Sequence, residues 1–230
     1  FFKQKTAYEI STRDWSSDVC SSDLELFKNY GGKFTPELKS PVVEMPYEGF
    51  TQEHYAQALI DEYKQAGIPA EDVFPQSFNL NDILYWIKKE PDFGKQAIYL
   101  DERYLQKDFD PQRPGDLQPS MTSLYQQGVR YIAPPIWVLL ATSSNNQMVA
   151  SEYAKAANAA GLKIITWSLE RDGSLVNGGG WYYQTVKNVI HDDSQTFQVL
   201  HVLAQEVGIK GIFSDWPATV TYYANCMGLD

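Results

Sequence analysis

Cysteines and basic side chains are scarce in this chain. Its 230 residues include only two cysteines, and 19 lysines and arginines stand against 29 aspartates and glutamates, a formal net charge of −10. Two cysteines cannot build a framework of several disulfides. Nucleic-acid binding needs clustered cations that displace the counterions of phosphates, so we expect no nucleic-acid partner.

Long apolar runs and dinucleotide motifs are also absent. No segment approaches the roughly 20 consecutive apolar residues of a membrane span, so we expect no stable membrane insertion. The chain has no Gly-x-Gly-x-x-Gly pattern of the dinucleotide-binding folds. It does have 43% apolar and 14% aromatic residues, and its length suffices for one large domain with a core or for two small ones.

Residues 1–24 do not look like part of a native domain. They lack the apolar region of a signal peptide. Reverse translation of residues 3–9 and 14–24 resembles a common short-read sequencing adapter, with residues 10–13 in the place of its index. We therefore interpret residues 1–24 as adapter-derived and residues 25–230 as the native domain, which holds 16 basic and 25 acidic side chains and a single cysteine, Cys226.

From residue 33 onward, short apolar segments alternate with amphipathic ones, which predicts an α/β architecture with a parallel sheet. The predicted strands are Lys33–Lys39, Asp72–Phe78, Gln96–Asp101, Val129–Ala133, Lys163–Leu169 and Gly211–Ser214. The predicted helices are a segment capped by Thr51 and closed by Gly67, Ile83–Lys89 capped by Asn81, Met148–Ala160, Gln195–Val207 capped by Ser194, and Ala218–Cys226 after Pro217. For the first helix we expect an inward face of Tyr55, Ala58, Leu59, Glu62 and Ala66.

This alternation favours a TIM (β/α)8 barrel over a dinucleotide fold, although six βα units cannot close an eight-unit barrel. We therefore expect a barrel that is truncated at its N-terminal side by about two units. Two insertions follow predicted strands, Gln106–Pro119 and Gly173–Gly180, the latter directly before Trp181, Tyr182 and Tyr183. Loops in this position build the active sites of such folds.

Chemically interesting side chains lie at the ends of the predicted strands. Glu37 and Lys39 are two residues apart, so their side chains point to the same face. The pair suits binding of a hard divalent cation and of a phosphate oxygen, and a simple ion pair explains it equally well. Gln76, Trp167 and Asp215 end further strands, where packing or helix capping is an alternative explanation for each.

The order of these motifs resembles the second half of the glycerophosphodiester phosphodiesterase family. The likeness spans Gly31 to Leu229 and includes Lys-Phe-Thr-Pro-Glu-Leu-Lys, Gln-Ser-Phe, Ile-Thr-Trp-Ser and Ser-Asp-Trp-Pro-Ala-Thr-Val. The resemblance implies a TIM barrel, a Ca²⁺ or Mg²⁺ site, and hydrolysis of a small-molecule glycerophosphodiester to glycerol 3-phosphate and an alcohol. It also favours, without deciding it, a secreted or periplasmic bacterial protein.

By the same resemblance, Glu37 is the metal-binding glutamate of the family's Glu-x-Lys motif, and Lys39 is its phosphate-binding lysine. Gln76, Phe78 and Trp167 would line the glycerophosphate pocket. In such a site, a cation and an ammonium group stabilise charge on the phosphoryl oxygens.

The family's His-Arg, Glu-Asn and His-Asp motifs belong upstream of Gly31, where nothing matches them. No catalytic histidine is therefore retained, and we expect the chain as written to be inactive. His54 and His201 fall within predicted helices, and His191 precedes two aspartates at a helix start, so structural roles are expected for all three.

Two alternatives remain open. One is a barrel related to the phosphatidylinositol or sphingomyelin phospholipases, which would show an exposed apolar lip on the loop Gly173–Tyr183. The other is a non-catalytic barrel that binds a sugar or a glycerol headgroup between its aromatic residues.

Overall fold

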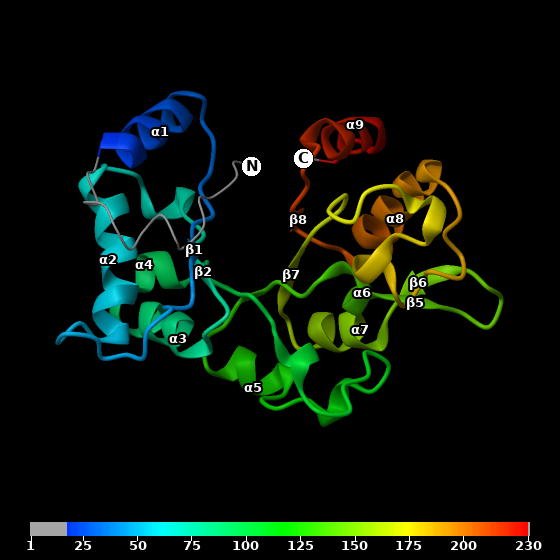
Figure 1. Cartoon of the computed structure of the whole chain (residues 1–230), viewed down its shortest axis with the longest axis horizontal. Coiled ribbons are helices and arrows are strands. Elements are labelled where there is room, and N and C mark those ends of the chain that lie inside the picture. Colours follow the sequence, from blue (N-terminus) through cyan, green and yellow to red (C-terminus); the bar gives the residue numbers. More distant parts are fainter. Residues whose placement is uncertain (1–17, 230) are drawn as a thin grey trace. The chain divides into compact units, whose positions relative to one another are not determined.

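A computed structural model describes residues 18–229, with side chains from residue 24 onward. The chain forms two compact units (Figure 1). The N-terminal unit extends to Leu100 and includes Gln127–Tyr131, and the C-terminal unit comprises Asp101–Gln126 and the chain from Ile132 onward. Of the segment interpreted as adapter-derived, residues 1–17 lie outside the described residues.

The N-terminal unit contains three of the predicted strands with helices between them. In chain order its elements are α1 (Asp18–Asn29), β1 (Glu37–Leu38), α2 (Gln52–Gln65), η2 (Ala70–Asp72), β2 (Gln76–Ser77), α3 (Leu80–Lys89), α4 (Pro91–Gly94) and β3 (Ile98–Tyr99). Strand β4 (Tyr131–Ile132) lies at the boundary between the units.

The strands of the N-terminal unit are parallel, as expected. β1 pairs with β2 so that Glu37 lies opposite Gln76, and β2 pairs with β3 so that Gln76 lies opposite Ile98. Fully buried apolar side chains, among them Ile60, Val73, Ile83 and Trp86, form the core of this unit. Parallel pairing brings the carboxyl ends of neighbouring strands to the same edge.

Helix α2 is present, with Thr51 as its N-cap, but its expected inward face is wrong. Ala56 and Ile60 are fully buried and Ala58 is exposed. The apolar residues of this helix are few enough to permit more than one face. The side of the helix that faces the core is set by the neighbouring elements.

The start of α3 also differs from the prediction. The side chain of Asn79, not Asn81, caps the helix by accepting a hydrogen bond from the backbone N–H of Asn81. The short helix α4 follows so closely that a Cβ atom on Gly94 would lie 2.5 Å from backbone atoms of Trp86 and Ile87. Only glycine allows this close approach.

The C-terminal unit contains the remaining strands and more irregular structure. Its elements are η3 (Arg103–Leu105), η4 (Pro114–Asp116), α5 (Met121–Gln126), α6 (Ile136–Leu139), β5 (Leu140–Thr142), β6 (Met148–Ala150), α7 (Glu152–Ala159), β7 (Lys163–Thr166), η5 (Leu175–Asn177), η6 (Gly180–Tyr183), η7 (Asp193–Gln195), α8 (Thr196–His201), η8 (Val202–Val207), β8 (Gly211–Ile212) and α9 (Pro217–Met227). β7 and β8 form a parallel pair.

A β-hairpin replaces the start of a predicted helix. Met148–Ala150 pairs antiparallel with Leu140–Thr142, so the predicted helical start at Met148 is wrong. The helix begins after Ser151, whose hydroxyl accepts a hydrogen bond from the backbone N–H of Ala154. Met148–Ala150 is too short and too apolar for periodicity to separate strand from helix.

The start of the helical segment near residue 195 is also two residues earlier than predicted. Asp192, not Ser194, caps it, and the side chain of Gln195 completes a capping box. The segment ends at Gly208 as predicted, with φ of +73°. Pro217 opens the last helix, which also agrees with the prediction.

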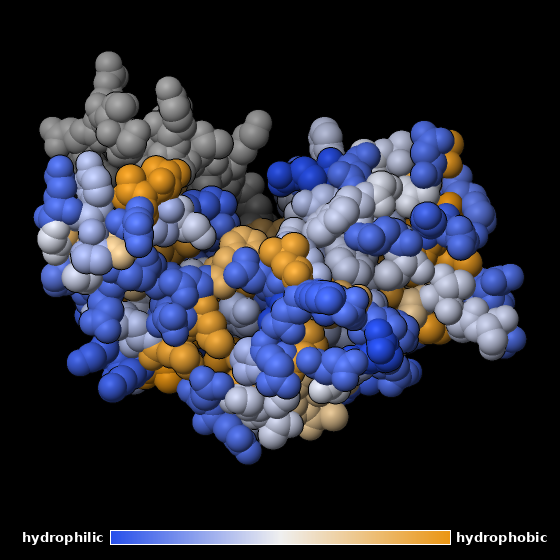
Figure 2. All heavy atoms as spheres, turned by 60° about the horizontal axis from the view of Figure 1, so that its bottom comes forward, coloured by the Kyte–Doolittle hydropathy of each residue, from blue (hydrophilic) through white to orange (hydrophobic). Residues whose placement is uncertain are grey.

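Polar and charged side chains cover much of the molecular face shown in Figure 2, with smaller hydrophobic areas between them. Within residues 18–229, every helix is too short or too polar to cross a lipid bilayer.

Candidate functional site

Glu37 and Lys39 lie together where β1 ends. The Nζ atom of Lys39 is 2.7 Å from Oε2 of Glu37, and Leu38 between them is buried on the opposite side. The Glu37 side chain is 15% exposed and that of Lys39 is 41% exposed. The predicted common face is therefore confirmed, and the pair offers one carboxylate and one ammonium group beside each other.

Gln76 lies next to this pair on β2, opposite Glu37 in the strand register. Its side chain is buried, and its Nε2 atom donates to the backbone carbonyl of Thr35 at 3.3 Å. The Oε1 atom of Gln76 and the hydroxyl of Thr35 are buried without a hydrogen-bond partner. Buried polar atoms are normally satisfied, so these two oxygens mark a place where a ligand could supply the missing partner.

Asp82 on α3 holds the end of β2. Its carboxylate accepts hydrogen bonds from the hydroxyl of Ser77 and from Nε2 of Gln52, both at 2.8 Å. The Ser77 hydroxyl in turn accepts from the backbone N–H of Asn79 at 3.0 Å. These bonds tie the strand end that carries Gln76 to the first turn of α3.

Asp82 should make stability depend on pH. Burial raises the pKa of its carboxyl, and the hydrogen bonds from Gln52 and Ser77 only partly oppose this. A raised pKa means that the folded state holds the proton more tightly, so the free energy of unfolding falls as pH rises from the ordinary pKa of 3.8 through the raised one. When the free energy of unfolding is measured in urea over this pH range, the Asp82→Asn variant should not show this decrease.

Asp92→Asn provides the control for that measurement, because the side chain of Asp92 is 85% exposed on α4. We expect its pH profile to follow that of the wild type. Parallel profiles for wild type and Asp82→Asn would contradict the prediction.

Phe78 also belongs to the N-terminal unit, as a half-buried residue after β2. Trp167 belongs to the C-terminal unit, where its Nε1 atom donates to the backbone carbonyl of Ala133 at 2.7 Å. The peptide bond between Trp167 and Ser168 is cis. The pocket role expected for Phe78 and Trp167 remains a prediction.

Trp167 is part of a larger group that we call the aromatic cluster, which consists of Tyr104, Trp137, Trp167, Trp181 and Tyr182. The rings of Trp167 and Trp181 stack with an angle of 27° and centroids 6.0 Å apart. Tyr104 meets the rings of Trp137, Trp167 and Trp181 at 5.9, 6.4 and 5.8 Å. The ring of Tyr182 lies 5.0 Å from that of Trp181.

Sequence reasoning missed Tyr104 and Trp137, which lie far from Trp181 in the chain. The sequence does contain one signal for this region, the run of three glycines directly before Trp181, which indicates a tight turn. Gly178, Gly179 and Gly180 all have positive φ, and a Cβ atom on Gly180 would lie 2.4 Å from Oδ2 of Asp172. This tight turn places Trp181 and Tyr182 against the other rings.

Two polar contacts connect the segments that follow β7 and β8. Arg171 donates to both carboxylate oxygens of Asp215, at 2.9 and 3.0 Å. Glu170 accepts from the hydroxyl of Ser214 and from the backbone N–H of Asp215. Asp215 is therefore an ion-pair partner, and it does not cap α9, whose N-cap position is occupied by Trp216.

His54 and His201 lie within helices and His191 precedes a helical turn, as expected from the sequence, and their structural roles remain a prediction. His54 is exposed on α2, and the Nδ1 atom of His201 lies 3.2 Å from the hydroxyl of Tyr223. The backbone N–H of His191 donates to Oε1 of Gln195 in the turn capped by Asp192.

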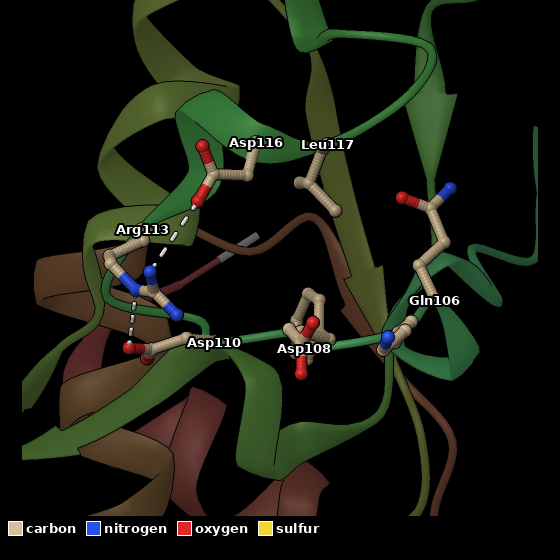
Figure 3. Close-up of a pocket in the computed structure, with 8 residues that line it drawn as sticks. Gln106, Asp108, Asp110, Arg113, Asp116 and Leu117 are labelled. Atoms are coloured by element: carbon tan, nitrogen blue, oxygen red, sulfur yellow. Dashed lines mark hydrogen bonds and ion pairs between the residues drawn. The ribbon is translucent and has the colours of Figure 1, made fainter.

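The insertion Gln106–Pro119 forms a shallow pocket of its own (Figure 3). Arg113 lies at one side of it, between Asp110 at 3.1 Å and Asp116 at 3.7 Å, and forms an ion pair with each. Asp110, Arg113 and Asp116 of this loop are thus paired with one another. None of the predicted site residues lines this pocket.

A hard divalent cation would find part of its ligand shell near β1. The carboxylate of Glu37 and the unpartnered Oε1 of Gln76 are oxygen donors on neighbouring strands. Ca²⁺ and Mg²⁺ require six or more oxygens. Among the side chains of residues 24–229, no three His, Cys, Asp or Glu residues cluster closely enough to hold a metal ion.

Comparison with known proteins gives one close relative by sequence. The chain is 47% identical over 204 residues to an extracellular protein of Arthroderma benhamiae, a match that covers 87% of this chain and 82% of the relative. No family model matches the chain. The relative is fungal, so the expected bacterial origin finds no support.

The fold is that of solved glycerophosphodiester phosphodiesterases. A protein from Silicibacter pomeroyi assigned to this group matches with a TM-score of 0.56 and 16% identity over 91% of this chain. A glycerophosphodiester phosphodiesterase from Parabacteroides distasonis matches with a TM-score of 0.55 and 15% sequence identity over 91% of this chain. An Oleispira antarctica phosphodiesterase was solved in complex with sn-glycerol-3-phosphate. It matches with a TM-score of 0.52 and 15% sequence identity over 89% of this chain. The chain spans only 57%, 64% and 60% of these three structures.

Proposed function

The chain belongs to the same family as the extracellular protein of Arthroderma benhamiae, and from this relationship and its fold we propose that it is the C-terminal part of a secreted phosphodiesterase. The intact enzyme would hydrolyse glycerophosphodiesters to glycerol 3-phosphate and an alcohol. The fold of phosphodiesterase structures, one of them solved with glycerol 3-phosphate, supports this substrate class.

The observation that carries the proposal is the group formed by Glu37, Lys39 and Gln76 at the end of β1 and β2. An ammonium group, a carboxylate and an unsatisfied amide oxygen lie on neighbouring parallel strands. Lys39 would bind a phosphoryl oxygen, and Gln76 would orient the glycerol part. Phe78, which follows β2 in the same unit, would pack against its carbon atoms.

Glu37 would supply one ligand to a Ca²⁺ or Mg²⁺ ion, and Oε1 of Gln76 would be a neutral second donor. Such an ion, when bound, stabilises negative charge on the phosphoryl group. The other carboxylates would come from the βα units that this chain lacks relative to a closed barrel.

We further propose that residues 1–24 replace native sequence upstream of Glu25. Amplification of genomic DNA across the codon for Glu25 tests this, because the adapter-like codons should be missing from the product. A genomic product that retains these codons would overturn the proposal.

This polypeptide should not turn over substrate, because its sequence has no match to the motifs that carry the acid and base histidines of glycerophosphodiester phosphodiesterases. Incubated with glycerophosphocholine and Ca²⁺ or Mg²⁺, the purified chain should release glycerol 3-phosphate no faster than Glu37→Gln, as measured by a coupled dehydrogenase assay. Turnover above that of the Glu37→Gln variant would show that the chain is catalytically complete.

A non-catalytic binding protein is the second candidate function. The partly exposed aromatic cluster favours it, because aromatic rings bind sugars and headgroups without any metal. Titration with sn-glycerol 3-phosphate in EDTA separates the two candidates. Binding that is unaffected by EDTA and by Glu37→Gln would favour the binding protein.

A further inference from the structure

Most rings of the aromatic cluster are partly exposed. Trp181 is 42% exposed, and Tyr104, Trp167 and Tyr182 are partly exposed. In contrast, the purely structural Tyr153 and Tyr183 of the same unit are each only 1% exposed. Exposed aromatic side chains that are held against one another commonly mark a binding surface.

The turn before Trp181 holds this surface in place. Gly179 and Gly180 adopt positive φ, and the backbone N–H of Tyr182 donates to Oδ2 of Asp172 at 3.2 Å. The Nε1 atom of Trp167 is fixed by the carbonyl of Ala133. The ring faces are therefore preorganised, which reduces the entropic cost of binding a ligand.

Charges of both signs lie near the cluster, but its cation is paired: Arg171, near Tyr182, donates to both carboxylate oxygens of Asp215. Glu102 is exposed at the N-cap of η3, two residues before Tyr104, and burial followed by the charge of Glu102 raises the pKa of the Tyr104 hydroxyl. Within the described part of the chain, Glu102 has no ion-pair partner, whereas the nearby Arg103 is paired with Asp101. A carboxylate without a counterion beside aromatic faces attracts a cation.

We propose that Tyr104, Trp181 and Tyr182, together with Glu102, bind a quaternary ammonium group such as that of choline. Ring faces attract a bulky, weakly hydrated cation through their quadrupoles, and Glu102 adds a full negative charge. In the proposed phosphodiesterase, the cation would be the alcohol part of the substrate. This last step rests on the proposed function, but binding of the cation itself does not.

Titration of the full chain with choline and with its neutral carbon isostere, 3,3-dimethylbutan-1-ol, tests the charge preference directly. Binding is followed by calorimetry at constant ionic strength. We expect choline to bind about five- to tenfold more tightly than the isostere. Equal affinities would overturn the proposal, and so would displacement of choline by a neutral sugar such as myo-inositol.

Variants locate the site. Trp181→Leu and Glu102→Gln should each weaken choline binding about five- to tenfold. Trp216→Leu and Glu152→Gln are matched controls, because both residues are exposed and lie outside the cluster, and they should change the affinity less than twofold. Unchanged binding in Trp181→Leu, with a native circular dichroism spectrum, would overturn the proposal.

A parallel titration with sn-glycerol 3-phosphate separates this inference from the proposed function. Binding of glycerol 3-phosphate without any binding of choline would refute the cation site alone. Binding of choline without glycerol 3-phosphate would support the cation site and count against the phosphodiesterase pocket.

Discussion

Replacing Asp101 by asparagine should destabilise the chain by about 3–5 kcal/mol, because it leaves a buried arginine without its counterion. Asp101 and Arg103 are 1% and 3% exposed. Arg103 donates from Nε to Oδ1 of Asp101 at 2.8 Å and from Nη2 to Oδ2 at 2.5 Å, and the hydroxyl of Tyr153 donates to the same carboxylate.

Arg103 cannot escape this loss by releasing its proton. Burial alone would lower its pKa, but the hydrogen bond and charge of Asp101 raise it above the ordinary value for arginine. In the variant, the guanidinium therefore stays charged and poorly solvated. Urea unfolding followed by circular dichroism measures the resulting loss.

Glu152→Gln is the matched control for Asp101→Asn. Glu152 also pairs with a cation, Lys155 at 2.7 Å, but the side chains are 51% and 60% exposed. Exposed ion pairs contribute about 0–1 kcal/mol. A second test is the double variant Asp101→Asn/Arg103→Met. It should lose less free energy of unfolding than Asp101→Asn alone, because it leaves no buried unpaired charge. A loss below about 1 kcal/mol in Asp101→Asn would contradict the prediction.

In the protein translated from an uninterrupted copy of the gene, Glu37→Gln and Lys39→Met should each lower kcat/KM about 10²- to 10³-fold, the usual effect of removing a group that stabilises transition-state charge. The two side chains are 2.7 Å apart and partly exposed, so both could reach a phosphoryl group. Steady-state assays with glycerophosphocholine provide the measurement.

Lys33→Met is the matched lysine control, because Lys33 precedes the same strand but lies outside the proposed site. Its side chain is 61% exposed, and its Nζ atom makes a long ion pair of 3.9 Å with Oδ1 of Asp72. It should leave kcat/KM within about twofold. EDTA should abolish the activity of the intact enzyme, and Ca²⁺ or Mg²⁺ should restore it. Wild-type kcat/KM in Glu37→Gln would refute the proposed role of this carboxylate.

Local patterns predicted the strands well. All six predicted strands are present, although each is shorter than its apolar segment. The common face of Glu37 and Lys39 followed from the two-residue period of a strand, which needs no knowledge of distant residues. Gly208 and Pro217 also ended and began helices as predicted, because their backbone preferences are local.

Predictions failed where two local solutions were nearly equal. Met148–Ala150 suited a strand or a helix, and its pairing with Leu140–Thr142 decided for the strand. Asp192 and Ser194 are both good helix caps, and the chain uses Asp192. For α2, the neighbouring elements selected Ala56 and Ile60 as the buried face.

The sequence alone therefore determined the order of the six predicted strands and of the helices between them, since this depends on periodicity and turn chemistry within a few residues. Only the tertiary structure decided that Tyr104 and Trp137 join Trp167 and Trp181, that Tyr153 completes the Asp101–Arg103 pair, and that Gln76 keeps an unsatisfied oxygen. Those contacts join residues far apart in the chain, and their formation depends on how the whole chain packs.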